Sequence, residues 1–388
     1  MSEVTTPCYI YSAETIRRQY HKLAGSFPGF LICYSLKANP NPAICRLLAD
    51  LGAGAEVSSR AELETALAAG FKPRDTIFVG PAKSQAEIEL AVSKGIYAIV
   101  ADSAEELRQI ETVCQSFNKT QFVLLRINTL EKPQGREKMV GGPSKFGFDE
   151  ETVIEQLRSV KLERTCIAGI QVYSASQVLD PSFLADHLEY VLSLARRLFN
   201  TDSNHGVLEP PPRCIDFGGG FGVPYSEEEA ELNLTPVAEA ACRLLAKNKD
   251  FLAGCRLLFE SGRYLVAESG IFLTRVVRVK ASRGMTFVIT DAGMNAFSRP
   301  VFMRVRHPIR LINRLAEPDA GRYEVCGPIC TPLDCLGTDV PLPRPEPGDI
   351  IGILNAGAYG WSMSLKDFMS LPHPAEFLSD NGRLTPIR

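Results

Sequence analysis

The feature that most constrains the fold is a regular alternation of short apolar runs and helix-like segments between residues 30 and about 262. Eight runs have the length and the β-forming residues of buried strands, and segments with helical periodicity lie between them. Strands that alternate with helices in this way run parallel, and their count and span favour a (β/α)₈ barrel over an open doubly wound sheet. The predicted strands are ICYSLKA, AGAEVS, TIFVG, YAIVAD, FVLLRIN, IAGIQVYS, CIDFGGG and CRLLFESG.

The pattern changes after about residue 265. Strand-like runs such as MTFVITDAG, RYEVCGP and DIIGIL follow one another without long helices, and prolines cluster at 341–347. We therefore predict a second, antiparallel β domain (a sandwich or barrel), which the N-terminal strand at Pro7–Tyr11 joins. The length of 388 residues also suggests two domains. The predicted boundaries are 12–265 for the barrel and 1–11 with 266–388 for the β domain.

Composition excludes several classes of protein. A net charge of -3 with 45% apolar residues is typical of a soluble globular protein and offers no basic field for nucleic acid. No apolar run is long enough to span a bilayer, and the N-terminus lacks a secretory signal. Eleven scattered cysteines favour a reducing, cytoplasmic compartment. We predict no metal site, because the five histidines are dispersed and Cys326 and Cys330 lack histidine partners.

Polar residues gather where the predicted barrel strands end, which is where barrels carry their chemistry. Lys37 follows the apolar run Phe30–Tyr34 and precedes an Asn-Pro-Asn-Pro loop. A lysine at the end of a buried strand is costly unless it is paired, depressed in pKa or used covalently, and a desolvated lysine suits imine chemistry. A lysine whose ammonium reaches solvent is the alternative at this position. The other strand-end residues are Glu56, Arg126, Tyr173, Gly218–Gly220 and Glu260.

Two of these strand ends suggest a phosphate-bearing ring cofactor. The glycines at 218–220 let backbone amides approach a phosphate closely, although a tight turn alone would also explain them. Glu260 could hold a proton on a ring nitrogen, and Arg263 could bind phosphate; an internal Glu–Arg ion pair is the alternative. In the β domain, Cys330 and Asp334 suit a polar cleft, and Tyr359 lies in a loop of small residues.

Together these residues resemble the fold-type III, pyridoxal-phosphate-dependent decarboxylases that act on diaminopimelate, ornithine and arginine. The resemblance runs from Thr6 to Phe377 and rests on separated motifs in the family's order. The motifs are TPCYIY, YSLKANPN, AEVSSRAEL, SKFGFD, IDFGGGFG, ESGR, DAGMNAFSRP, CGPICTPLD and GAYG.

The resemblance implies a role for each matched residue. Lys37 would form the internal aldimine with pyridoxal 5'-phosphate, and Cys330 would protonate the quinonoid carbon after carbon dioxide leaves. Family members build the site across a homodimer interface, so Cys330 and Asp334 would reach into the other subunit. Glu260 would pair with the pyridine nitrogen. The other implied cofactor residues are Glu56 near the imine, Gly262 in the ESGR motif, and Ser176, Gly218, Gly219, Gly220, Arg263 and Tyr359 around the phosphate.

Three departures from the family pattern concern the substrate. Tyr173 replaces the histidine that stacks on the cofactor, in a VYSxxQ pattern similar to the branch found in natural-product and polysaccharide biosynthetic clusters. Thr331 replaces an acid that binds a distal ammonium in diamine-forming members. Arg299 is kept from an Arg-Pro-x-x-Tyr motif, but Met303 stands where the tyrosine would be. We therefore expect Arg299, Thr331 and Asp334 to meet a substrate other than free ornithine or diaminopimelate.

The first hypothesis is thus a decarboxylase of a conjugated or carrier-linked amino acid in a specialised biosynthetic pathway. Diaminopimelate decarboxylation is the second, and Thr331 and Met303 count against it. An alanine-racemase-type enzyme would share the barrel, but its motifs are absent from the sequence. A non-catalytic regulatory homologue would be expected to lose cofactor residues, whereas Lys37 and Glu260 are present.

Overall fold

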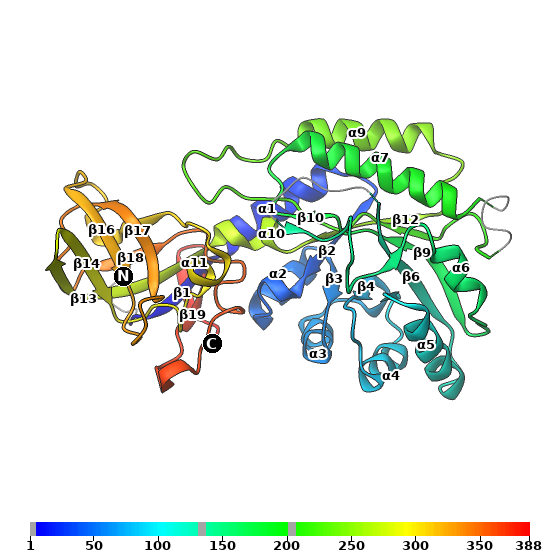
Figure 1. Ribbon diagram of the computed structural model, residues 1–388, viewed down its shortest axis with the longest axis horizontal. Coiled ribbons are helices and arrows are strands. Elements are labelled where there is room, and N and C mark those ends of the chain that lie inside the picture. The colour runs from blue at the N-terminus through cyan, green and yellow to red at the C-terminus, as the bar shows by residue number, and fades with distance from the viewer. Residues whose placement is uncertain (1–4, 131–136, 201–206) are drawn as a thin grey trace.

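The computed structural model describes residues 5–130, 137–200 and 207–388. Eight parallel strands form a barrel, which closes where β5 pairs with β6 (Figure 1). The predicted (β/α)₈ barrel is therefore confirmed. Its strands are β2 (Phe30–Ser35), β3 (Gly54–Val57), β4 (Thr76–Phe78), β5 (Ala98–Ala101), β6 (Gln121–Asn128), β9 (Thr165–Gln171), β11 (Cys214–Asp216) and β12 (Arg256–Ser261).

Helices follow the barrel strands, and short-range chemistry fixes where several of them begin. Ser59, Ser84 and Ser103 each accept a hydrogen bond from the amide three residues later, so each caps a helix N-terminus. Gly70 and Gly95 end two of these helices in the left-handed conformation that favours glycine. The helices are α1 (Ala13–Ser26), α2 (Pro42–Asp50), α3 (Arg60–Ala69), α4 (Gln85–Lys94), α5 (Ala104–Ser116), α6 (Val153–Arg158), α7 (Pro181–Leu198), α9 (Thr235–Lys247) and α10 (Arg263–Val266).

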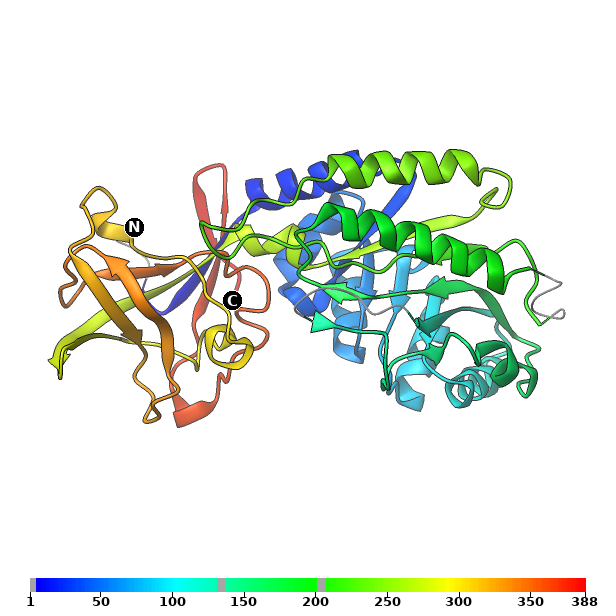
Figure 2. The same cartoon turned by 45° about the horizontal axis from the view of Figure 1, so that its top comes forward.

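The second unit is a separate sheet that lies beside the barrel in both views (Figures 1 and 2). The N-terminal strand β1 sits inside this sheet, between β13 and β19. Most pairings are antiparallel as predicted, but β1 with β19 and β14 with β16 are parallel, so the sheet is mixed. Its strands are β1 (Cys8–Ser12), β13 (Gly270–Ser282), β14 (Met285–Thr290), β15 (Ile309–Leu311), β16 (Gly321–Cys326), β17 (Cys335–Leu342), β18 (Ile350–Ile353), β19 (Ala375–Asp380) and β20 (Arg383–Pro386).

Strand β17 and the short helix α11 (Arg299–Met303) are absent from the elements expected from sequence. Pro341 lies within β17, where a proline would break a central strand, but β17 is at the end of the sheet order. The domain boundaries at about residues 12 and 265 stay a prediction. Across the described residues, none of the helices combines the length and the apolar content that crossing a membrane requires.

Glycines allow the barrel strands to approach one another closely. A Cβ atom on Gly169 in β9 would lie 1.7 Å from the carbonyl oxygen of Cys214 in the neighbouring strand β11. Gly25, in contrast, lies in α1 with nothing within 4 Å of the corresponding position. A side chain at position 169 would therefore collide with the neighbouring strand, whereas one at position 25 would not.

We predict that Gly169→Ala lowers the free energy of unfolding by about 3 kcal/mol, because the added methyl group must displace backbone. Gly25→Ala is the matched control and should raise stability by about 0.5–1 kcal/mol, since alanine favours the helix. Urea denaturation followed by circular dichroism measures both variants. Equal midpoints for the two variants would contradict this account of the barrel wall.

Candidate active site

Lys37 and Glu56 form an ion pair at the mouth of the barrel. Lys37 lies in a single 3₁₀ turn directly after β2, and its Nζ is 2.9 Å from Oε1 of Glu56 in β3. The pairing of Ser35 with Glu56 in adjacent strands brings the two side chains together. Glu56 is completely buried, whereas 38% of the Lys37 side chain is exposed toward the cavity described below.

This ion pair decides the charge of the lysine. Burial acts to lower the pKa of Lys37, but the neighbouring carboxylates of Glu56 and Glu260 outweigh it and raise the pKa. The amine is therefore held as an ammonium, and a depressed pKa is not how this chain accommodates the lysine. Paired in this way, Lys37 remains beside the cavity at a fixed position.

The glycine turn after β11 lies against the same region. Cβ atoms on Gly218 and Gly219 would lie 2.4 Å from the carbonyl oxygen of Val172 and 1.9 Å from that of Glu260, so close backbone approach requires both glycines. Gly218 also has a φ of 65°, in the left-handed region. Gly262 contacts the segment on either side of Lys37, because its Cβ would lie 2.7 Å from that of Ala38.

Arg263 contacts two of the other residues predicted to bind phosphate, Ser176 and Tyr359. Its guanidinium donates to the Ser176 hydroxyl at 3.3 Å and lies 4.9 Å from the ring centre of Tyr359. It also donates to the hydroxyl of Tyr225 at 3.1 Å. A small hollow next to these groups is lined by Ser176, Gly220, Gly262, Arg263 and Tyr359, among other residues.

Glu260 and Asp216 form a buried pair of carboxyl groups below this hollow. Glu260 accepts a hydrogen bond from Gln171 at 2.9 Å, and Asp216 accepts one from the Gly218 amide at 2.9 Å. Burial raises the pKa of both groups, and the Glu260 charge further raises the pKa of Asp216. The pair therefore keeps a proton that solvent carboxyl groups would lose. Asp216 was missed from sequence, although it lies only two residues before Gly218, the first residue of the glycine run.

Arg299 is buried and lines the cavity, rather than lying on the outer surface of the protein. The side chain is 2% exposed, and its guanidinium lies 5.0 Å and 5.7 Å from the ring centres of Tyr225 and Tyr359. Its Nε donates to Nε2 of His307 at 3.2 Å, while Nδ1 of His307 lies 2.9 Å from the Leu354 carbonyl oxygen. Burial and Arg299 lower the pKa of His307 to about 3, so the imidazole is neutral and accepts from Arg299. No pattern in the sequence pointed to His307.

These groups surround a cavity of about 450 Å³. Lys37, Tyr173, Glu260, Arg263, Arg299 and Tyr359 line it together with loops that follow the barrel strands. The ring of Tyr173 lies 5.7 Å from the Lys37 Nζ, so it can cover one face of a group bound to the lysine. The apolar part of the lining consists of Val79, Pro81, Met139, Phe146, Met303 and Met363.

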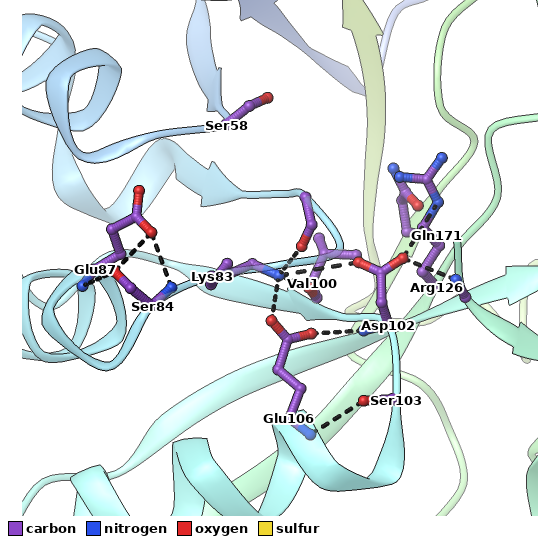
Figure 3. A network of polar contacts seen from close by, with 12 residues as sticks. Ser58, Lys83, Ser84, Glu87, Val100, Asp102, Ser103, Glu106, Arg126 and Gln171 are labelled. Atoms are coloured by element: carbon purple, nitrogen blue, oxygen red, sulfur yellow. Dashed lines mark hydrogen bonds and ion pairs between the residues drawn. The ribbon is translucent and has the colours of Figure 1, made fainter. Parts of the chain in front are cut away.

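A buried polar network supports one wall of this cavity (Figure 3). The Nζ of Lys83 donates to Glu106 at 2.9 Å and to the carbonyl oxygens of Gly80 and Val100, both at 2.6 Å. Asp102 accepts from the Gly147 amide at 2.8 Å, and its other oxygen lies 4.0 Å from the Lys83 Nζ. The network therefore fixes Gly80, which lines the cavity, and the loop that carries Phe146.

Arg126 joins this network to the cavity surface. Its Nε lies 3.9 Å from Oδ1 of Asp102, and its guanidinium lies 4.3 Å from the ring centre of Phe146. Figure 3 shows Arg126 next to Gln171, the residue that donates to Glu260. Arg126 was predicted from the sequence as a strand-end residue, whereas Lys83, Asp102 and Glu106 were not.

Three predicted residues lie away from this cavity. Cys330, Thr331 and Asp334 are in the turn between β16 and β17, and none of them is among the residues that line the cavity. Asp334 is 3% exposed and accepts hydrogen bonds from the amides of Met294 at 2.6 Å and Ile329 at 2.8 Å. Its carboxylate organises the turn, and Cys330 is exposed on it.

Most of the barrel matches a known protein family. Residues 13–267 match the family model described as pyridoxal-dependent decarboxylase, pyridoxal binding domain. The chain belongs to this decarboxylase family. It is therefore a pyridoxal-phosphate-dependent amino-acid decarboxylase, a carboxy-lyase.

Alignments with curated relatives and with solved structures cover almost the whole of this chain. It is 38% identical to an L-glutamyl-[BtrI acyl-carrier protein] decarboxylase of Niallia circulans, covering 99% of this chain and 91% of the relative. It is 34% identical to a diaminopimelate decarboxylase of Helicobacter pylori (strain J99), covering 99% and 92%. The crystal structure of the Helicobacter pylori diaminopimelate decarboxylase complexed with L-lysine matches with a TM-score of 0.88 and 33% identity, covering 100% and 94%.

The residues of this decarboxylase fit its cofactor. A phosphate fits beside Arg263, Ser176 and the glycine turn, where a side chain would collide with backbone. A protonated pyridine nitrogen fits a carboxylate that is buried beside a second acid, as Glu260 is. One carboxylate oxygen of Glu56 and one of Asp216 are buried without a hydrogen-bond partner. Each of these oxygens can therefore still accept a hydrogen bond.

We predict that Lys83→Met destabilises the protein by about 3–5 kcal/mol, because it leaves the Glu106 and Asp102 carboxylates buried without their cation. The matched control is Lys72→Met, a substitution on the exposed surface that should change stability by less than about 0.5 kcal/mol. Urea denaturation measures both. A Lys83→Met protein as stable as the control would show that the network is not needed for the fold.

We predict a pH-dependent contribution from Glu62, which lies next to the ion pair. Burial and the Glu56 charge raise its pKa from 4.5 to about 7. Since the folded state holds this proton more tightly, its stabilising effect is present below pH 4.5 and is lost as the pH rises through 7. The difference in unfolding free energy between wild type and Glu62→Gln should therefore fall by about 2 kcal/mol between pH 4.5 and 7.5. A pH slope that Glu62→Gln retains would contradict the assignment.

Proposed function

We propose that this enzyme decarboxylates a conjugated or carrier-linked α-amino acid rather than a free diamino acid. The charge of the cavity lining carries this proposal. Among the described lining residues, the cations are Lys37, Arg126, Lys145, Arg263 and Arg299, whereas Glu260 is the one acid. Glu260 already accepts from Gln171, so a distal substrate ammonium would meet positive charge without a carboxylate partner.

The uncharged part of the lining supports the same substrate class. Met139, Met303 and Met363 offer flexible apolar surface in the cavity lining. An amide or thioester that replaces a distal charge is accommodated there more readily than an ammonium. The relative from Niallia circulans, whose name specifies a glutamyl group on an acyl-carrier protein, supports a carrier-linked substrate in a biosynthetic pathway.

The mechanism assigns a task to each residue of the site. When bound, pyridoxal phosphate supplies an electron sink for the electrons of the broken carbon–carbon bond. Lys37 supplies the amine that holds the cofactor, and Glu56 keeps that amine in place at 2.9 Å. Glu260 holds a proton at the ring nitrogen, with Asp216 as its buried neighbour. Arg263, Ser176, Tyr359 and the 218–220 amides bind the phosphate.

We further propose that the protein is a homodimer in which Cys330 from one copy protonates the substrate carbon in the other. Cys330 is exposed and lies outside the cavity of its own chain, which supports action in a second copy. The surface also carries large exposed apolar side chains: Leu333 is 64% exposed, Phe302 51% and Phe368 46%. Exposed apolar side chains of this kind are typical of an interface. Thr331 would enter the partner's site with Cys330, whereas Asp334 stays buried in its own turn, where it accepts from the Met294 and Ile329 amides.

Diaminopimelate decarboxylation is the second candidate, favoured by the relatives that carry that name and by Arg299. Arg299 lines the cavity and could meet a distal carboxylate. Diaminopimelate also carries a distal ammonium, however, for which the lining has no carboxylate to spare. The two candidates are therefore distinguished by whether the enzyme consumes a linked amino acid or free diaminopimelate.

The test is carbon dioxide release by the pyridoxal-phosphate-loaded protein. Free ornithine, lysine, glutamate and diaminopimelate are compared with glutamate linked as an amide, as a pantetheine thioester and on a carrier protein. We expect release from linked substrates and at least about a hundredfold lower kcat/KM for free diamino acids. Efficient turnover of free diaminopimelate would establish the second candidate instead.

Two variants separate the chemical roles. Lys37→Ala should lose the visible imine absorbance and nearly all release, because no amine remains to hold the cofactor. Cys330→Ala should keep the absorbance but lose about 10²–10⁴-fold in kcat, the usual range for a proton donor. Full activity of Cys330→Ala would contradict the assigned proton donor while leaving the reaction class intact.

A further inference from the structure

Two further cysteines lie at the base of the turn that carries Cys330. Cys326 is the last residue of β16 and Cys335 is the first residue of β17. Both cysteines are half-buried, and neither forms a disulfide. The eight residues between them include Cys330 and Asp334. They are not part of the cavity lining.

The strand register places these two cysteines directly opposite one another. Cys326 and Cys335 are Cα partners in the antiparallel pairing of β16 with β17. The Gly327 amide donates to the Asp334 carbonyl oxygen at 3.1 Å, so the cysteines occupy the adjacent position, at which the two paired residues exchange no backbone hydrogen bond with each other. Cα atoms at such positions are about 4.5 Å apart, at the lower end of the range that a disulfide spans.

The thiols also differ in reactivity. The interaction between the two thiols lowers the pKa of Cys335 and raises that of Cys326. The Cys335 sulfur also lies 3.5 Å from the Gly337 carbonyl oxygen and 3.9 Å from the Glu324 carboxylate. Cys335 is therefore the better nucleophile, and Cys326 is the neighbour that can resolve a mixed disulfide. A disulfide at the short end of the Cα range stores strain, which makes it easily reduced.

We propose that Cys326 and Cys335 form a reversible disulfide that controls the turn carrying Cys330. The functional part of this proposal rests on the proton-donor role proposed above for Cys330. Bond formation fixes the two sulfurs about 2.05 Å apart and so moves the base of the turn. Asp334 directly precedes Cys335, and its carboxylate accepts a hydrogen bond from the Ile329 amide at 2.8 Å. Because Ile329 directly precedes Cys330, a movement of Cys335 also moves Cys330.

The oxidant belongs to the class of small disulfides, such as oxidised glutathione. The Cys335 thiolate attacks one sulfur of that disulfide and releases a glutathione thiolate. Cys326 then loses its proton, attacks the Cys335 sulfur and displaces the second glutathione. In total the two protein thiols lose two electrons and two protons, and one oxidised glutathione becomes two glutathione molecules.

Disulfide mapping tests the site without any substrate. The pyridoxal-phosphate-loaded protein is incubated with oxidised glutathione and cleaved before Asp334, which separates Cys335 from Cys326 and Cys330. We expect the two fragments to remain linked in wild type and in Cys330→Ser, and to separate in Cys326→Ser and after dithiothreitol. Trypsin cannot make this distinction, since no lysine or arginine lies between Arg322 and Arg344. Cys242→Ser, which removes an exposed cysteine on α9, is the matched control and should behave as wild type.

Two further readouts test the consequence for Cys330. Oxidation should change the rate at which iodoacetamide alkylates Cys330 several-fold, and should lower kcat on a linked substrate about tenfold or more. Dithiothreitol should reverse both effects, and Cys326→Ser should show neither. Linkage through Cys330, absence of linkage, or linkage that leaves the alkylation rate unchanged would overturn the proposal. Loss of all turnover in reduced protein would instead count against the proposed function, because mapping and alkylation are read without turnover.

Discussion

The ion pair between Lys37 and Glu56 is the interaction on which the site depends. Glu56 is completely buried at the end of β3, where an uncompensated carboxylate would be strongly destabilising. The parallel register of β2 and β3 brings the required cation to it, because Ser35 and Glu56 are paired and Lys37 is two residues further on. The ion pair that compensates the buried charge of Glu56 therefore also holds the Lys37 amine beside the cavity.

Around this pair, charge is distributed unevenly. Acidic groups lie on the barrel side, where Glu260 and Asp216 share a dry environment and keep a proton. The other charged residues of the described lining are the cations Lys37, Arg126, Lys145, Arg263 and Arg299, and the Tyr359 ring covers the Arg263 guanidinium. The lining therefore offers one acidic position, at Glu260, and otherwise favours anionic or neutral groups.

Local sequence signals predicted much of this arrangement. Alternating apolar runs gave eight barrel strands, because each strand is buried over almost its full length, and serine caps and glycine ends marked helices such as α3 and α4. Lys37 and Glu260 were predicted because they follow such runs. His307 was not, since its role depends on Arg299 and on a carbonyl 47 residues away. The parallel pairing of β1 with β19 joins opposite ends of the chain, which no local pattern encodes.

The two units contribute to different walls of one cavity, and the Tyr359 amide joins them by donating to the Ala38 carbonyl oxygen at 2.7 Å. The residues proposed to hold the cofactor come mainly from the barrel, whereas Arg299, Met303 and Met363 come from α11 and the segment after β18. Changes in these peripheral segments can therefore alter substrate choice without touching the cofactor residues on the barrel. Such a division allows one scaffold to diversify in evolution while its chemistry stays constant.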